Sequence, residues 1–289
     1  MAQALILCRF MQFASAMLLW GIGAFRVGLA SADLRIWPNW PGRIWSGLVG
    51  LNLASTVIWL MLEAGEAGDG WVETLSPDTI WALLRETAFG HVWLLRLVVA
   101  AALVASLVMR WPVALTVLAA GNLASLALVG HAAMHEGWIG LAQRANQMVH
   151  LLAAGFWIGS LPALLSCLPA LARPDQRQQA TRALTQFSGF GHLAVALVLL
   201  TGVANVGLIL GAHLPTLGSP YRVMLAVKVG LVAVMVAIAL CNRYVFVPRL
   251  SRGKGDAALR AIAVATVVEI ILGAAVLALV SAFATFDPV

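Results

Sequence analysis

The sequence predicts an all-α, polytopic membrane helix bundle with about eight transmembrane helices. Hydrophobic residues make up 62% of its 289 positions and charged residues only 10%, whereas water-soluble domains are about one-quarter charged. The mean hydropathy is +0.93. Apolar runs of about 20 residues recur along the chain, and each is long enough to cross a hydrocarbon core about 30 Å thick as a helix. The period-two alternation that is typical of a porin-type barrel is absent from the sequence.

The predicted spans follow the apolar runs in chain order. They cover residues 3–30, 43–62, 90–109, 112–130, 144–171, 181–210, 221–247 and 258–283. We interpret the first run as a retained helix, because it carries Arg9 and Arg26 and is longer than a signal peptide. A short interfacial helix is expected over residues 77–88, which begin with proline and have one apolar face. Residues 1–289 are expected to form a single membrane domain, since no soluble domain or low-complexity linker interrupts the runs.

Charged residues separate between alternate loops, and this separation predicts the orientation in the lipid bilayer. One set of loops, with the adjoining helix ends, is basic and contains Arg26, Arg35, Arg43, Arg110, Arg173, Arg177, Arg182, Arg243, Arg249, Arg252, Lys254 and Arg260. The other set is acidic and contains Glu63, Glu66, Asp69, Glu73, Asp78, Glu86 and Glu136. Because Lys and Arg are retained on the cytoplasmic side, both termini are expected on the outer, periplasmic face. Topology then explains the formal charge of +6, and no nucleic-acid partner is expected.

Soft metal ligands gather at the predicted outer face. His131, Met134 and His135 lie within five positions of one loop. Imidazole and thioether groups are ligands that Cu(I) accepts, whereas Mg²⁺ and Ca²⁺ prefer oxygen. Their spacing places the three side chains on one face of a turn or helix end. His91, at the outer end of the third predicted span, is a further candidate ligand. The alternative is that these polar side chains are merely solvated at the membrane surface.

Two further histidines lie deeper in the predicted bundle. His150 follows Arg144, the expected outer edge of the fifth span, by six residues, which places it about 9 Å below that edge. His192 is expected about 14 Å from the outer face, so the two imidazoles are predicted to share a layer. Such a pair can hold a metal ion or a haem iron, and the alternative is that each imidazole bonds a neighbouring carbonyl. Lys228 and Glu269 are also intramembrane charges, and an ion pair between them is one arrangement open to them.

Several segments of the chain are similar to one family. They are residues 130–132 (GHA), 146–159 (NQMVHLLAAGFWIG), 187–188 (FS), 201–205 (TGVAN), 228 (K), 242–243 (NR) and 248–250 (PRL). These segments resemble the CopD/PcoD family of bacterial inner-membrane copper proteins, and the resemblance extends over about residues 90–289. It implies an eight-helix inner-membrane protein that moves copper with a small periplasmic copper-binding partner of the CopC type. It also implies a ligand role for the residues in the matching stretches, namely His131, Met134, His135 and His150.

The sequence therefore predicts a protein that takes copper ions from the periplasmic side and passes them inward through His150 and His192. No enzyme or ATP-driven pump is expected, because the sequence has no plausible nucleophile–base pair, phosphate-binding glycine loop or HExxH motif. One alternative is a b-type membrane cytochrome or copper-linked quinone oxidoreductase, in which intramembrane histidines bind haem b. A second alternative is a scaffold that docks a periplasmic copper chaperone without transporting the ion.

Overall fold

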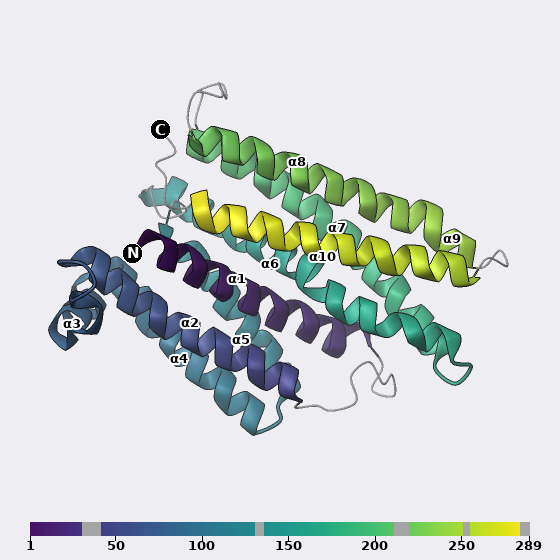
Figure 1. Cartoon of the computed structure of the whole chain (residues 1–289), viewed down its shortest axis with the longest axis horizontal. Helices are drawn as coiled ribbons and strands as arrows, with labels where there is room; N and C mark the ends of the chain where they lie inside the picture. Colours follow the sequence, from purple (N-terminus) through teal and green to yellow (C-terminus); the bar gives the residue numbers. More distant parts are fainter. Residues whose placement is uncertain (31–41, 131–135, 211–219, 251–254, 284–289) are drawn as a thin grey trace.

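The computed structural model describes residues 1–30, 42–130, 136–210, 220–250 and 255–283. Within these ranges every regular element is helical (Figure 1). The α-helices are α1 (Ala2–Ala24), α2 (Arg43–Ala67), α3 (Pro77–Glu86), α4 (Ala88–Val108), α5 (Pro112–Ser125), α6 (Gly137–Cys167), α7 (Arg177–Leu210), α8 (Pro220–Cys241), α9 (Val247–Leu250) and α10 (Gly255–Phe283). Short 3-10 or π-helical segments adjoin them, namely η1 (Phe25–Leu29), η2 (Glu73–Leu75), η3 (Leu126–Leu128), η5 (Leu168–Ala172) and η6 (Asn242–Phe246). The predicted all-α bundle is confirmed.

The helices match the predicted spans in number and order. Across the described chain, seven helical segments are long and apolar enough to cross a membrane, and an eighth, Pro112–Leu128, is apolar but shorter. Several helices begin earlier than predicted, since α6 starts at Gly137 rather than at residue 144 and α7 starts at Arg177 rather than at residue 181. The four residues added to α7 are Arg, Gln, Gln and Ala, which are good helix formers, so this helix continues past the end of the apolar run. The residues added to α6 are mostly apolar (GWIGLAQ) and lie before Arg144.

The two ends of the bundle differ in charge. Figure 1 shows the N-terminus, the end of α10 and α3 at one end, and α9 at the other. We call the first the acidic end, because it carries Glu73 and Asp78, and the second the basic end, because Arg177 and Arg249 lie there. The first and last helical turns therefore lie on the same side. That this side is periplasmic remains a prediction from the loop charges.

The predicted short helix between the second and third spans is present as α3. Pro77 occupies its first turn, where a missing backbone N–H does no harm. The side-chain oxygen of Ser76 caps the helix by accepting a hydrogen bond from the backbone N–H of Thr79 at 3.4 Å. The helix packs against α2 and α4 at the acidic end.

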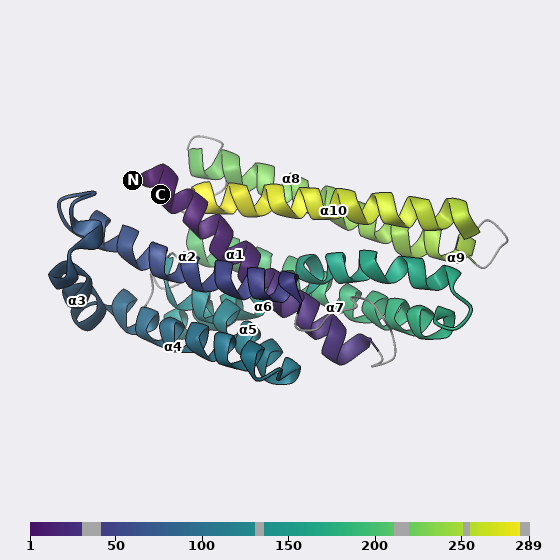
Figure 2. The same ribbon diagram turned by 60° about the horizontal axis from the view of Figure 1, so that its bottom comes forward.

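Helix α1 lies at the centre of the bundle. It packs against α2 and α5 on one side and against α6 and α10 on the other (Figure 2). Its crossing with α6 depends on two glycines, because a Cβ atom on Gly159 would lie 2.0 Å from the carbonyl oxygen of Met17, and one on Gly21 would lie 2.2 Å from the backbone of Gly159. Small residues at such a crossing let two helix backbones approach closely. The Ser160 hydroxyl donates to the Gly21 carbonyl across this contact at 2.9 Å.

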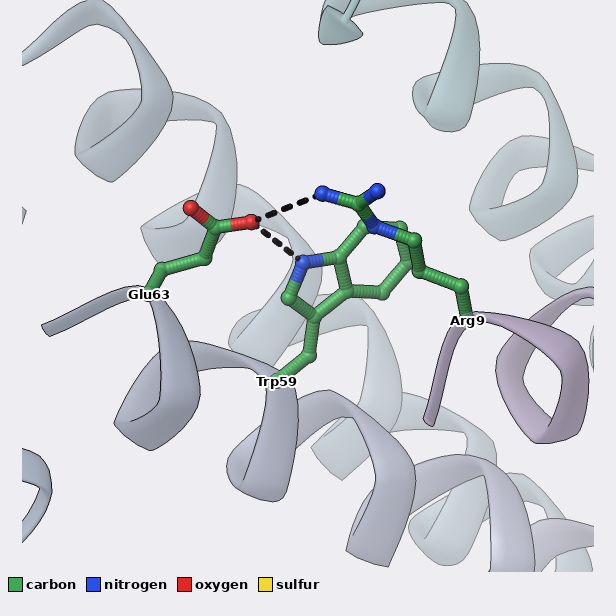
Figure 3. A network of polar contacts seen from close by, with 3 residues as sticks. All are labelled: Arg9, Trp59 and Glu63. Carbon is green, nitrogen blue, oxygen red and sulfur yellow. Dashed lines mark hydrogen bonds and ion pairs between the residues drawn. The ribbon is translucent and has the colours of Figure 1, made fainter. Parts of the chain in front are cut away.

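A charged contact joins α1 to α2 near the acidic end. Arg9 Nη2 lies 3.4 Å from Glu63 Oε1, and Trp59 Nε1 donates to the same oxygen at 2.8 Å (Figure 3). The Arg9 guanidinium also lies over the Trp59 ring, 5.5 Å from its centroid. The apolar ring face and the carboxylate together accommodate a cation that interrupts the first apolar run.

Candidate functional site

His150 is oriented by a contact between α6 and α7. Its Nδ1 atom lies 2.9 Å from the Thr201 Oγ1 atom. The Thr201 hydroxyl has one proton and donates it to the Leu197 carbonyl of its own helix at 2.5 Å, so its oxygen accepts the bond from Nδ1–H. The Nε2 atom of His150 therefore keeps its lone pair. A histidine that ligates a metal has this form, with one nitrogen fixed by a hydrogen bond and the other available.

A belt of amides lies one helical turn from His150, toward the acidic end. Asn146 Nδ2 donates to the Thr201 carbonyl at 3.0 Å and to Asn205 Oδ1 at 2.9 Å. Asn205 Nδ2 in turn donates to Gln147 Oε1 at 2.7 Å. Residues four apart on a helix share a face, which is why Asn146 lies beside His150 and Asn205 beside Thr201. We call these five residues the His150 cluster.

Two features shape the space around the imidazole. A Cβ atom on Gly202 would lie 3.6 Å from His150 Cε1, so the glycine leaves α7 close to the ring without crowding it. Lys228 of α8 is near enough to act electrostatically on the imidazole. A cation bound at Nε2 and the Lys228 ammonium would repel each other, and this repulsion limits how tightly the cluster holds such an ion.

His192 lies in a different layer from His150. It precedes Thr201 by nine residues of α7, which separates it from the His150 level by about 13 Å along the helix axis. The prediction that the two imidazoles share a layer is wrong, because the depth of His192 was counted across a core about 30 Å thick, whereas the 34 residues of α7 extend over about 51 Å. His192 Nδ1 lies 2.5 Å from the Ser188 carbonyl, and its Nε2 lies 3.4 Å from the Tyr244 hydroxyl. In this arrangement the two histidines do not ligate one metal ion or one haem iron.

The remaining predicted ligands lie apart from the His150 cluster or outside the described residues. His91 is exposed at the start of α4, and its Nε2 atom lies 3.0 Å from the Arg85 carbonyl. His131, Met134 and His135 lie outside the described residues. The described residues contain no group of three His, Cys, Asp or Glu side chains that could hold a metal ion.

Glu269 and Lys228 do not pair. The Glu269 carboxylate is 3% exposed and accepts a hydrogen bond from Asn242 Nδ2 at 3.2 Å. Asn242 follows Lys228 by fourteen residues, and the α-helical rise over that distance is about 21 Å. The ion pair that was open from the sequence is therefore not formed. Glu269 instead lines a cavity of about 1220 Å³ between α6, α7, η6 and α10.

One buried charge was not singled out from the sequence. Arg96 of α4 is fully buried, and its Nη1 atom donates to the Asn122 carbonyl at 3.0 Å and to Ser125 Oγ at 2.6 Å. The Asn122 amide also donates to Asn52 Oδ1 at 2.8 Å. The sequence could have identified Arg96, because it is an arginine within an otherwise apolar run and a charge at such a position is unfavourable in lipid. This cluster joins α2, α4 and α5, far in sequence from His150.

Comparison with known proteins gives the chain its family. Residues 1–141 match the family model of the copper resistance protein D-like N-terminal domain, and residues 181–283 match that of copper resistance protein D. The inner membrane protein YebZ of Escherichia coli (strain K12) is 35% identical over 98% of each chain. Copper resistance protein D of Pseudomonas syringae pv. tomato is 32% identical over 95% of this chain and 93% of its own length.

A more distant relative matches only in part. The copper transport protein CutJ of Bacillus subtilis (strain 168) is 27% identical over 68% of this chain and 38% of its own length. No solved structure matches the chain significantly. One assignment follows from three observations: two nearly full-length relatives are more than 30% identical, two family models match, and the helices are long and apolar enough to span a membrane. The chain belongs to the copper resistance protein D family of multi-pass inner-membrane proteins.

Proposed function

We propose that this protein moves copper ions through the inner membrane, from the periplasm toward the cytoplasm, with His150 Nε2 as an intramembrane ligand. The hydrogen bond from His150 Nδ1 to Thr201 carries the proposal, because it leaves Nε2 with its lone pair between two membrane helices. Two relatives carry the names copper resistance protein D and copper transport protein CutJ, which supports copper as the cargo. Copper is the cargo here, and the proposal includes no chemical conversion.

The entry step of the proposed path uses the loop before α6. His131, Met134 and His135 stand in the sequence between η3 and α6, and they supply nitrogen and sulfur atoms that suit Cu(I). We propose that they receive the ion from a periplasmic copper-binding protein of the CopC type and deliver it to His150. The amides of the His150 cluster lie between the imidazole and the acidic end of the bundle, which is the side from which the ion would arrive.

Copper binding and uptake by His150 variants test the proposal. In proteoliposomes that contain the purified protein, His150→Ala is expected to abolish copper uptake and to remove one bound Cu(I). His150→Met is expected to keep part of both, because a thioether is also a soft ligand. Val149→Ala is the matched control, since Val149 neighbours His150 but is exposed on the other face of α6. Full uptake by His150→Ala would show that the path does not use this residue.

A visible spectrum separates the copper path from the cytochrome alternative. The purified protein is expected to show no Soret band, and His150→Ala is expected to leave the spectrum unchanged. A Soret band that is present in the unmodified protein and lost in His150→Ala would identify His150 as a haem ligand and would replace copper transport as the function of the cluster.

A further inference from the structure

A polar stripe on α7 leads from the basic end of the bundle into the large cavity. The stripe consists of Arg177, Thr181, Thr185, Ser188 and His192, and all five side chains line the cavity. Their spacing of four, four, three and four residues places them on one face of the helix. The stripe spans fifteen residues, or about 22 Å along the axis. Five polar side chains along one helix face would be energetically unfavourable if that face contacted only lipid or apolar neighbours.

The buried carboxyl group of Glu269 lines the same cavity. Its Oε2 atom accepts from Asn242, and the Trp157 side chain also hydrogen-bonds the carboxyl group. Among the described residues, Glu269 Oε1 and Asn242 Oδ1 have no hydrogen-bond partner. Both atoms are acceptors, so the partners that are missing must be donors. A buried carboxylate oxygen without a donor is strongly unfavourable, and a proton or water molecules that reach the cavity would remove that penalty.

The π-helical segment η6 brings Asn242 to this position. It interrupts the regular α-helical bonds between α8 and α9 and packs against α10. Such π-helical turns within longer helices occur frequently at functional sites. Asn242 and Tyr244 of this segment both line the cavity, and Tyr244 contacts His192 of the stripe. The segment thus joins the inner end of the stripe to the carboxyl group.

The charges that face the cavity lie mostly near the basic end. Its charged or titratable side chains are Arg177 and His192 from α7, Arg243 and Tyr244 from η6, and Glu269 itself. Over the described ranges, α1 and α8 add no charged side chain to the lining, and α6 adds only neutral ones. The two side chains that hydrogen-bond Glu269, Trp157 and Asn242, are both neutral. The carboxyl group therefore gains and loses a proton with no ion-pair partner that must be broken.

We propose that Glu269 is a proton-exchange site that water reaches from the basic end, and that its protonation state controls the rate of copper movement. The inference rests on the proposed transport function. The step is a simple exchange, in which the carboxylate binds one proton from the basic side to form the carboxylic acid and later releases it to the same side. No electron moves. Glu269 and Asn242 offer only oxygen atoms as ligands, which suit a proton better than soft Cu(I), so the copper ion and the proton occupy separate sites.

The two sites are close enough to be coupled through one helix. Trp157, which hydrogen-bonds Glu269, follows His150 by seven residues of α6. Two helical turns, or about 10 Å, therefore separate the imidazole from the indole. Protonation changes the hydrogen bonds that Glu269 makes to α6 and η6, and α6 also presents His150 to the cargo ion.

Transport by proteoliposomes tests the coupling. Copper uptake driven by a copper gradient is expected to change with the pH on the basic side, and Glu269→Gln is expected to reduce this change at least about tenfold. Glu269→Asp, which keeps a carboxyl group, is expected to retain the pH response. Glu66→Gln, at an exposed glutamate of the acidic end, is the matched control. An undiminished response of uptake to the pH on the basic side in Glu269→Gln would overturn the proposal, as would an equal response of the unmodified protein to the pH on the acidic side alone.

A second measurement does not depend on copper. An apolar carbodiimide modifies protonated carboxyl groups within membranes, and mass spectrometry locates the product. Modification of Glu269 is expected to rise as the pH on the basic side falls and to be insensitive to the pH on the acidic side. If the modification responds as expected but the unmodified protein transports no copper, the proposed transport function is wrong while the proton site is supported. If the modification does not respond to pH on the basic side, the proton site is wrong.

Discussion

The hydroxyl group of Thr201 connects the backbone of α7 to the imidazole of α6. It donates to Leu197 and accepts from His150 Nδ1, so one oxygen atom fixes both the orientation of the ring and the nitrogen that carries its proton. Side chains that orient a ligating histidine in this way commonly affect metal affinity nearly as much as the ligands do. The proposed copper path therefore depends on Thr201 as well as on His150.

Replacing Thr201 by valine tests this dependence. Valine keeps the shape of threonine but cannot accept the Nδ1–H bond, so we expect Cu(I) affinity to fall about 10-fold to 100-fold. The measurement is a competition titration with a Cu(I) chelator on the purified variant. Thr116→Val is the control, because the Thr116 hydroxyl likewise donates to a carbonyl of its own helix, that of Pro112, but lies far from His150 in sequence on α5. An affinity that is equal in both variants would contradict the role given to Thr201.

Arg96 illustrates a residue whose role is structural. Ser125→Ala removes one of its two oxygen acceptors, and because the guanidinium is fully buried, no water replaces that acceptor. We expect a loss of about 1.5–3 kcal/mol of stability, the typical contribution of a hydrogen bond to a charged group. Thermal denaturation in detergent measures it. Ser166→Ala is the control, since the Ser166 hydroxyl bonds only the Ala163 carbonyl of its own helix. Equal melting temperatures for the two variants would show that the Ser125 hydroxyl does not stabilise the buried guanidinium of Arg96.

At the scale of helices, the sequence predicted the spans well and their lengths less well. Apolar runs identify where a chain must cross a bilayer, so the seven long apolar helices, the shorter apolar segment Pro112–Leu128 and the short helix α3 were all predicted. The apolar runs do not show how far a helix continues beyond the bilayer, and α6 extends seven residues before Arg144 while α7 has 34 residues. Depths counted across a core about 30 Å thick therefore misplaced the level of His192 relative to His150. The partnership of His150 with Thr201 required the structure, because the rotation of α7 about its axis is not encoded in hydropathy.

The crossing of α1 and α6 is the helix contact most sensitive to side-chain size. A methyl group on Gly159 would collide with the Met17 carbonyl, whereas one on Gly121 of α5 meets no atom within 4 Å. We expect Gly159→Ala to destabilise the bundle by about 1–3 kcal/mol, the usual effect of overpacking. Gly121→Ala is expected to be neutral or to stabilise α5 by up to about 1 kcal/mol, because alanine favours helix. Thermal melts of the two variants in the same detergent make the comparison. Equal melting temperatures would show that α1 and α6 can separate without penalty.

Across the whole molecule, the His150 cluster and the proposed proton site lie at different levels along the helices. His131 and His135 precede α6 in the sequence, the His150 cluster lies nearer the acidic end, and the Glu269 cavity extends toward the basic end. This order gives the bundle a direction. Whether copper enters at the acidic end depends on which side of the membrane that end faces, and the loop charges alone predict that it is periplasmic.

Accessibility labelling of single cysteines decides the orientation. The native Cys8, Cys167 and Cys241 are first replaced by alanine. Asp78→Cys at the exposed start of α3 and Arg177→Cys at the exposed start of α7 then mark the acidic and basic ends. An impermeant thiol reagent added to intact spheroplasts is expected to label only the cysteine at position 78, because arginine-rich loops are retained in the cytoplasm. Labelling of position 177 alone would show that the topology is the inverse of the predicted one. The proposed path would then run outward, since its order of ligands along the helices would stay the same while the compartments exchanged.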